Sequence, residues 1–334
     1  MAEQPGTELG RPPVEVKPSP ETPVARDVAP ELPLADVLAG ASRREVRVLD
    51  HGFLALLDVM PRLVPTAPGA APTADGAVVQ AARVSYGQGT KKLSEDRGLI
   101  RYLLRHRHST PFEMVEFKFH VAMPIFVARQ WIRHRTASVN EYSARYSVVP
   151  DRFYIPTPEN IRKQSRSTRQ GGSDRFSESD AGDTGTVREY LAFLRDVEAL
   201  YPRYAGLLDK GVSRELARIG LPVNVYTEWY WKCDLHNVLR FLSLRMDDHA
   251  QEEIRAYARA MHDLIAPIVP LTIEAWRDYE FEGLRLSRPE IEAIRSLASG
   301  GAGELPGDNQ RERDEWAAKR GRLGLTPGGS SENR

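Results

Sequence analysis

Hydrophobic and polar residues alternate in three separate stretches of the chain, and this pattern predicts β-strands. Residues 44–60, "REVRVLDHGFLALLDVM", begin with alternation, and residues 115–123 and 223–231 repeat it. Successive side chains of a strand point to opposite faces of a sheet, so each stretch should bury one side. On the second stretch that side holds Val115, Phe117, Phe119 and Val121.

Between these stretches, apolar residues recur at the spacing of helices. In residues 94–108 Ser94 is placed to cap a helix, and Leu99, Ile100, Leu103 and Leu104 fall on one face. Pro124 suits the start of a second helix, through residue 135, because proline is tolerated at a first helical position. Further helices are predicted at 186–211, ended by Gly211, at 213–222, at 234–247 with Asp234 as N-cap, and at 250–269.

The chain is therefore predicted to hold one compact, helix-rich α+β domain at residues 45–290. Residues 1–44 are rich in Pro, Glu, Ala and Val, and residues 299–334 are polar. Such compositions lack the apolar side chains of a core, so both tails are expected to be disordered. The polar segment 163–185 inside the domain is expected to be a flexible surface insertion.

Composition narrows the class of protein. The 334 residues carry 46 basic and 46 acidic side chains, which argues against a general nucleic-acid binder. No apolar run reaches the ~18 residues that span a bilayer, and the N-terminus does not resemble a secretory signal. The single cysteine, Cys233, excludes an intrachain disulfide framework and a multi-cysteine metal site. These features predict a cytosolic protein without membrane association.

Against this neutral background, residues 129–146, "RQWIRHRTASVNEYSARY", collect cations. They contain Arg129, Arg133, Arg135 and Arg145 but only one carboxylate, Glu141. A solvated helix C-terminus is one interpretation, since cations suit that end of the helix dipole. The other is a turn that binds an anion, because planar guanidinium groups match phosphate. The short polar side chains that follow favour the second interpretation.

The same stretch carries a resemblance to a known family. Arg133-His134-Arg135-x-x-Ser138-x-Asn140-Glu141-x-Ser143-x-Arg145-Tyr146 matches every fixed position of RHRxxSxNExSxRY, the motif of the flavin-dependent thymidylate synthases (ThyX type). The segments "AARVSY", "RHRHSTPFE", "FVARQW" and "LSLRMDDHAQEEIRAYA" also resemble the family. The likeness extends from about residue 45 to 285 and leaves out both tails and the 163–185 segment.

The resemblance implies a fold with a mixed or antiparallel sheet and a reaction. Family members make dTMP from dUMP, with 5,10-methylenetetrahydrofolate as carbon donor, NADPH as reductant and FAD as hydride carrier. They are homotetramers whose sites are shared between subunits. No nucleic acid, membrane or metal takes part.

Site residues follow by matching positions to the family motifs. The resemblance assigns these residues to dUMP: Gln130, Trp131, Ile132, Arg133, Glu141, Tyr142, Ser143, Ala144, Arg145, Arg218 and Arg245. It assigns these to FAD: Ser85, Thr110, Arg133, His134, Arg135, Glu141, Asp234, His236 and Arg240. Arg245 is the implied catalytic residue, placed against the pyrimidine to favour its anionic form.

Four positions depart from the family pattern. Met114 stands where members often have His, so that position is expected to tune packing. Asp234, His236 and Arg240 stand where some relatives have Asn, Arg and Asn around the flavin. Asp234 is equally well explained as a helix cap alone.

Three other residue types are candidates for a chemical role: histidines as metal ligands, and a cysteine and a serine as nucleophiles. His106, His108 and His120 have poor spacing for a metal, and His108 is placed better near the flavin. Cys233 has no local His partner, so a buried, inert thiol is expected. Ser143 has no adjacent base and is interpreted as a hydrogen-bond donor to substrate.

Two alternative functions remain open from the sequence. The arginine-rich loop could belong to a nucleic-acid-binding module, which would show steep salt dependence and no bound chromophore. The chain could also be a flavin-binding protein without synthase activity, which only a turnover assay separates from the enzyme.

Overall fold

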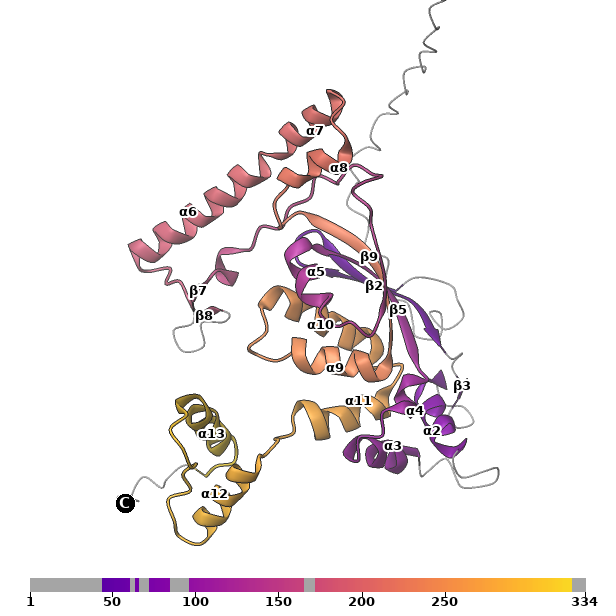
Figure 1. The fold of residues 1–334 in the computed structure, drawn as a ribbon, viewed down its shortest axis with the longest axis vertical. Helices are drawn as coiled ribbons and strands as arrows, with labels where there is room; N and C mark the ends of the chain where they lie inside the picture. Colours follow the sequence, from indigo (N-terminus) through magenta and orange to yellow (C-terminus); the bar gives the residue numbers. More distant parts are fainter. Residues whose placement is uncertain (1–43, 61–63, 66–71, 85–95, 165–171, 326–334) are drawn as a thin grey trace, which may run out of the picture.

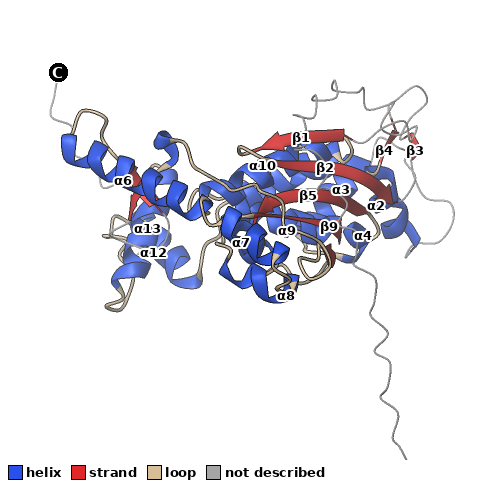
Figure 2. Cartoon of the chain, turned by 90° about the horizontal axis from the view of Figure 1, so that it is seen from above, coloured by secondary structure: helices blue, strands red, loops and turns tan. Residues whose placement is uncertain are grey.

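The fold is built around one antiparallel sheet. The computed structural model describes residues 44–60, 64–65, 72–84, 96–164 and 172–325. Five strands lie in the order β1-β2-β5-β9-β6, with every neighbouring pair antiparallel (Figures 1 and 2). The five are β1 (Arg44–Val48), β2 (Gly52–Met60), β5 (Glu116–Pro124), β6 (Ser138–Glu141) and β9 (Tyr226–Asp234). The α+β prediction is confirmed, and the sheet is antiparallel.

The two long central strands pair over their whole length. In β5 and β9, Phe117 lies opposite Cys233, Phe119 opposite Trp231, and Val121 opposite Trp229. All six side chains are buried. The strict alternation in the sequence therefore identified the buried face correctly, and Trp229 and Trp231 belong to the core as expected.

The described part of the chain holds twelve α-helices. They are α2 (Asp75–Arg83), α3 (Asp96–Arg105), α4 (Thr110–Glu113), α5 (Ile125–Trp131), α6 (Ala181–Glu198), α7 (Tyr201–Asp209), α8 (Arg214–Ala217), α9 (Leu235–Arg245), α10 (Glu252–Ile265), α11 (Pro270–Trp276), α12 (Arg288–Ala298) and α13 (Gln310–Arg322). Short helices occur at η3 (Pro158–Asn160), η4 (Arg218–Gly220) and the π-helix η5 (Arg277–Phe281). None of these described helices is long and apolar enough to cross a membrane.

The main core lies between the sheet and a layer formed by α9 and α10. Val238 and Phe241 of α9, together with Ile254 and Tyr257 of α10, are completely buried in the same cluster as Trp231. Figure 2 shows these helices behind the strands. A smaller cluster of Val149, Phe153, Tyr204, Ala217 and Val225 joins α7 and α8 to the chain that follows β6.

The predicted helix at 186–211 is two helices. The α6 helix ends at Glu198 and α7 starts at Tyr201. Pro202 is the physical reason, because its ring cannot continue a helix but fits the first turn of a new one.

The segment 163–185, expected to be a flexible insertion, holds regular structure where it is described. Strands β7 (Arg162–Gln164) and β8 (Gly172–Arg175) form a two-stranded ribbon. The α6 helix already begins at Ala181, since the Asp180 carboxylate caps it by accepting a hydrogen bond from the Asp183 N–H. Residues 165–171 lie outside the described part. A second small ribbon pairs β3 (Val64–Pro65) with β4 (Pro72–Thr73).

The prediction of a disordered tail from residue 299 is wrong for residues 310–322, which form α13. Trp316 of this helix is 3% exposed and donates its indole N–H to the Gly303 carbonyl, in the loop after α12, at 2.8 Å. Lys319 pairs with the buried Glu290 of α12 at 2.7 Å. We call α12 and α13 the C-terminal helical pair, which Figure 1 shows set apart below α11. The predicted disorder of residues 1–44 falls almost wholly outside the described residues.

Candidate functional site

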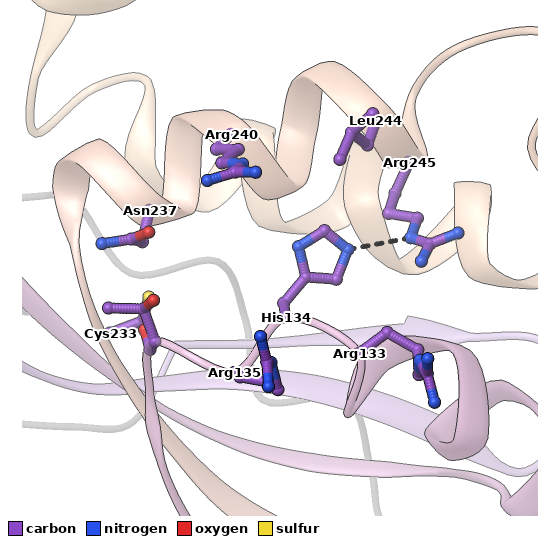
Figure 3. A pocket seen from close by; sticks show the side chains of 9 residues that line it. Arg133, His134, Arg135, Cys233, Asn237, Arg240, Leu244 and Arg245 are labelled. Atoms are coloured by element: carbon purple, nitrogen blue, oxygen red, sulfur yellow. Dashed lines mark hydrogen bonds between the residues drawn. The ribbon is translucent and has the colours of Figure 1, made fainter.

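A pocket of about 260 Å³ lies between the turn after α5 and the exposed side of α9 (Figure 3). The described residues that line it are Arg133, His134, Arg135, Thr136, Cys233, Asn237, Arg240, Leu244 and Arg245. Four of these are arginines, and no Asp or Glu is among them. The cations of the sequence motif therefore meet two more cations from a helix a hundred residues later.

The RHR residues form a turn rather than the last turn of a helix. The predicted helix extends to residue 135, but α5 ends at Trp131. The backbone N–H of Ile132 still bonds to Ala128, and that of His134 bonds to Trp131 at 2.9 Å. The chain then bends into β6. Ending the helix early allows Arg133, His134 and Arg135 to line one pocket.

The α9 helix presents its arginines in a fixed register. Asp234 caps it by accepting from the Asn237 N–H at 2.9 Å, and its carboxylate also accepts from the Asn237 side chain. Val238 and Leu242 on its inner face are completely buried. Arg245, three residues beyond Leu242, lies at the end of the helix and is half-buried.

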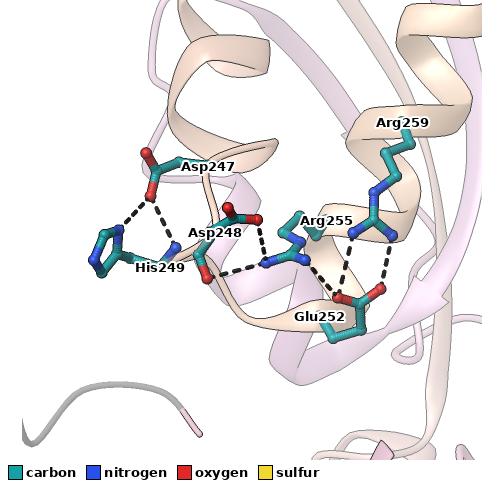
Figure 4. Close-up of polar contacts among 6 residues, drawn as sticks. All are labelled: Asp247, Asp248, His249, Glu252, Arg255 and Arg259. Atoms are coloured by element: carbon teal, nitrogen blue, oxygen red, sulfur yellow. Dashed lines mark hydrogen bonds and ion pairs between the residues drawn. The ribbon is translucent and has the colours of Figure 1, made fainter. Parts of the chain in front are cut away.

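Charged side chains stabilise the turn that follows Arg245 (Figure 4). Arg255 of α10 contacts Asp248 at 3.3 Å and Glu252 at 3.2 Å, and Glu252 also pairs with Arg259 at 2.7 Å. Because Arg255 is only 17% exposed, this network fixes where α10 begins relative to the end of α9. The position of the Arg245 backbone is set by both helices.

The Arg245 guanidinium is held at two points by the turn after α5. Its Nε donates to His134 Nε2 at 3.0 Å, and its Nη2 donates to the Gln130 carbonyl at 3.1 Å. Burial lowers the pKa of Arg245, and an arginine nevertheless stays protonated at neutral pH.

His134 is kept neutral by its surroundings. Burial, and then the positive charges of Arg245 and Arg240, lower its pKa from 6.5 to about 4. A neutral imidazole has one acceptor nitrogen, and here that nitrogen accepts from Arg245. The pocket thus combines permanent cations with a histidine that carries no charge.

The second half of the motif lies in a different environment. Glu141, at the end of β6, accepts a hydrogen bond from the Thr227 hydroxyl at 2.8 Å. Arg145 pairs with Glu215 of α8 at 3.2 Å, and Ala144 packs against the smaller cluster beside α8. Arg218 follows directly as the first residue of η4. Residues 144, 145 and 218 therefore gather around α8 and do not line the pocket in this chain.

The remaining predicted residues are distributed as follows. Gln130 donates its side-chain amide to Gln251, and the Tyr142 hydroxyl donates to the Val148 carbonyl at 2.6 Å. The Ser143 carbonyl accepts from the Tyr146 N–H at 3.1 Å. Ile132 and Thr110 are exposed and His236 is half-buried, while Ser85 lies outside the described residues.

Two sequence assignments change with these surroundings. The Trp131 side chain is fully buried against Phe241 and the strand tryptophans, so it cannot reach a ligand in this chain. The Asp234 carboxylate accepts from Asn237 and acts as the predicted helix cap.

Asn237 lines the pocket and was not identified from the sequence. It lies three residues before Arg240 and seven before Leu244, which places all three on one face of α9. Residues three apart share a helix face, so the predicted role of Arg240 would have pointed to Asn237 as well. Thr136 was missed because a turn has no periodicity from which to infer direction.

Cys233 is a buried thiol, as expected. It is 3% exposed and donates to the Thr136 carbonyl at 3.1 Å. Burial raises the pKa of the thiol well above its usual range, which suppresses the nucleophilic thiolate. Among the residues with described positions, no three His, Cys, Asp or Glu side chains are grouped to hold a metal ion.

Comparison with known proteins identifies the family. Residues 68–271 match the family model described as thymidylate synthase complementing protein. A flavin-dependent thymidylate synthase of Dictyostelium discoideum is 57% identical over 297 residues, which cover 89% of this chain and 93% of the relative. A flavin-dependent thymidylate synthase of Gluconobacter oxydans (strain 621H) is 52% identical over 277 residues, which cover 81% of this chain and 86% of the relative.

Solved structures agree with the sequence comparison. The crystal structure of a UMP/dUMP methylase, PolB from Streptomyces cacaoi, bound with 5-Br UMP has a TM-score of 0.57 and 34% identity to this chain. It covers 70% of this chain and 97% of its own. Because the family model covers more than half of the chain and close relatives match most of it, the protein belongs to the flavin-dependent thymidylate synthase family.

Proposed function

We propose that the protein catalyses the reductive methylation of dUMP to dTMP. The carbon donor is 5,10-methylenetetrahydrofolate, the reductant is NADPH, and FAD carries the hydride. Family membership supports this reaction, and one structural observation carries the assignment of the site. Four arginines and a neutral histidine line a pocket whose described lining contains no carboxylate.

The residues of the pocket fit an anionic flavin nucleotide. Within the described residues, Arg133, Arg135 and Arg240 make no ion pair, so their charge is left for a ligand to neutralise. Guanidinium groups bind phosphate oxygens in a bidentate manner, and Asn237 adds an amide at the same wall. When bound, FAD supplies the hydride transferred to the pyrimidine.

In the proposed reaction the protein contributes fixed charge and orientation. Arg245 is held by His134 and Gln130, and no acceptor among the described residues takes its remaining N–H groups, which are proposed to meet negative charge that develops on the pyrimidine. Its partial burial strengthens that interaction, because a low-dielectric site screens charge less than water does. No residue acts as a covalent nucleophile in this scheme, which agrees with the buried thiol of Cys233.

The nucleotide site is proposed to be completed by a second subunit of a homotetramer. Arg145, Arg218 and Ala144 lie around α8, whereas Arg245 and Arg133 line the pocket. We propose that these two groups of residues meet one dUMP from two copies of the chain. Exposed apolar side chains beside α8 support a protein interface there, namely Tyr146, Leu216, Ile219 and Val223, each at least 62% exposed.

The nucleic-acid module is not favoured, because the cations line a bounded pocket and the whole chain has no net charge. The relatives are enzymes by name, which gives no support to a flavin protein without synthase activity. A cytosolic location stays a prediction from the single, buried cysteine.

The test is to purify the full chain, record its absorbance spectrum and assay dTMP formation. We expect a flavin spectrum and turnover that requires dUMP, methylenetetrahydrofolate and NADPH together. Flavin without dTMP formation would contradict the synthase assignment. Absence of flavin, with none taken up from added FAD, would contradict the pocket assignment.

A further inference from the structure

The His134 ring is fixed between two groups, and this raises the question of what its second nitrogen does. On one side Nε2 accepts from Arg245 Nε at 3.0 Å. On the other, the ring packs edge-to-face on Phe241 with centroids 4.9 Å apart. Phe241 is itself stacked on the buried Trp131 at 4.7 Å. The imidazole therefore has little room to rotate.

The contact with Arg245 determines the tautomer of His134. The arginine Nε always carries a hydrogen, so His134 Nε2 must present its lone pair and the single proton of the neutral ring resides on Nδ1. In Figure 3 Nδ1 is turned away from Arg245, toward the side of the pocket where Arg240 and Asn237 lie. No protein group with a described position accepts a hydrogen bond from it.

A donor aimed into a pocket of cations needs an acceptor from outside the protein. The charged groups that act on the ring are Arg245 and Arg240 of α9, and both are donors. Arg133 and Arg135 line the same pocket, and the Asn237 amide donates to Asp234 rather than bonding to the ring. An acceptor atom on the bound ligand would receive the Nδ1–H. It would also make Nε2 more basic, because hydrogen bonds in a chain polarise one another, and so would strengthen the hold on Arg245.

From this geometry we infer that His134 is a positioning residue that couples the ligand in the pocket to the orientation of Arg245. Its Nδ1–H donates to an acceptor of the flavin, and its Nε2 aligns the guanidinium toward the pyrimidine. This inference rests on the proposed function. It adds that binding of the flavin and productive placement of the nucleotide are linked through one imidazole.

Two substitutions separate the two nitrogens. In His134→Asn the amide nitrogen replaces Nδ1 and nothing reaches Arg245. In His134→Gln the amide oxygen takes the place of Nε2 and the donor at Nδ1 is lost. A hydrogen bond to a charged group contributes about 1.5–3 kcal/mol, or roughly 10- to 150-fold.

The two variants should therefore fail differently. We expect the Asn variant to retain FAD within about threefold of wild type and to lose about 100-fold in kcat at saturating FAD. The Gln variant should bind FAD about tenfold more weakly than wild type does. Its kcat should be at least tenfold higher than that of the Asn variant. Equal losses of both properties in both variants would indicate a packing role and overturn the inference.

A double substitution tests whether His134 acts through Arg245. In the Arg245→Ala background, His134→Asn should lower kcat by no more than about threefold further, because the group it positions is gone. If the loss in kcat of the double variant equals the product of the losses of the two single variants, the two residues act independently and the coupling is contradicted.

The tautomer itself is measurable in the unmodified protein. Nitrogen-15 chemical shifts of histidine, with the His134 signal identified by its loss in His134→Gln, should show the proton on Nδ1. A proton on Nε2 would overturn the inference whatever the kinetics of the variants. The tautomer and FAD affinity do not depend on dTMP formation, so failure of the proposed function would be recognised separately.

Discussion

Arg145 Nε lies 3.2 Å from Glu215 Oε1, and this ion pair joins the loop after β6 to α8. Both side chains are more than half exposed, at 52% and 57%. An exposed pair of this kind contributes only about 0–1 kcal/mol, so a phosphate can displace the carboxylate at little cost. Glu215 therefore orients Arg145 but leaves it able to bind a phosphate instead.

The first prediction concerns this competition. Glu215→Gln should tighten dUMP binding by about two- to fivefold, because Arg145 no longer has to leave a carboxylate to meet the nucleotide phosphate. Isothermal titration with dUMP measures the change. Glu292→Gln is the matched control, since Glu292 forms a similarly exposed pair with Arg288 on α12 and should have no effect. Weaker binding by the Glu215 variant would show that the pair orients Arg145 for substrate.

The second prediction separates Arg245 from Arg133. Arg245→Ala should keep FAD and lose about 10²–10³ in turnover, because charge developing on the pyrimidine is no longer met. Arg133→Ala should purify with less flavin, since Arg133 lines the pocket without a carboxylate partner in the described chain. The flavin-to-protein absorbance ratio and dTMP formation are measured for both. Arg288→Ala, at an exposed position, serves as control. If the Arg133→Ala protein keeps full flavin content and full activity, Arg133 does not belong to the site.

The third prediction is that Cys233 is not the nucleophile. Cys233→Ser can still donate to the Thr136 carbonyl, so turnover per bound FAD should fall less than tenfold. A nucleophile would lose nearly all activity on this change, and burial already opposes the thiolate. Turnover is assayed on folded, flavin-loaded protein.

Those parts of the fold whose periodicity is set by burial could be read from the sequence. The alternation in β5 and β9 marked residues that are now seen buried, and Asp234 caps α9 as predicted. In each case a local pattern and a tertiary contact favour the same structure. The motif residues were located by resemblance, which is a statement about sequence rather than about contacts.

Where tertiary contacts decide, the sequence was insufficient. The end of α5 at Trp131 depends on His134 meeting Arg245, a residue 111 positions away. The α13 helix is almost entirely polar and buries one side chain, Trp316, so its composition resembles that of a disordered tail. The sequence also could not show which motif residues share a pocket: Arg145 pairs with Glu215 of α8 and does not line the pocket of the RHR turn.

The fourth prediction concerns the C-terminal helical pair. Trp316→Ala should unfold α13 locally, since truncating a buried Trp typically costs about 3–5 kcal/mol and Trp316 is the buried residue of this helix. Hydrogen exchange should accelerate in residues 310–322, while flavin content and turnover stay within about twofold of wild type. Leu323→Ala, at a 41% exposed position, is the control. Loss of turnover with intact flavin would show that the pair takes part in catalysis.

The last prediction follows from the depressed pKa of His134. Its folded pKa of about 4 lies below the usual 6.5, so the unfolded chain binds a proton more readily than the folded protein does. The neutral histidine therefore contributes its full share of stability above pH 6.5, and this share is lost as the pH falls from 6.5 toward 4. One unit of pKa corresponds to 1.36 kcal/mol; after allowance for the partial exposure of the ring, about 1–2 kcal/mol should be lost.

His134→Gln provides the comparison for this pH effect, because glutamine does not titrate. Thermal unfolding of both proteins between pH 4 and 7.5 should show the wild type losing stability relative to the variant only below pH 6.5. Burial, Arg245 and Arg240 oppose protonation of the folded ring, so Arg240→Ala should raise its folded pKa. The loss should then still begin near pH 6.5 but end at a higher pH and be smaller in total. A difference between wild type and His134→Gln that is constant across this range would mean that the ring does not titrate with the depressed pKa, and that its contact with Arg245 does not keep it neutral.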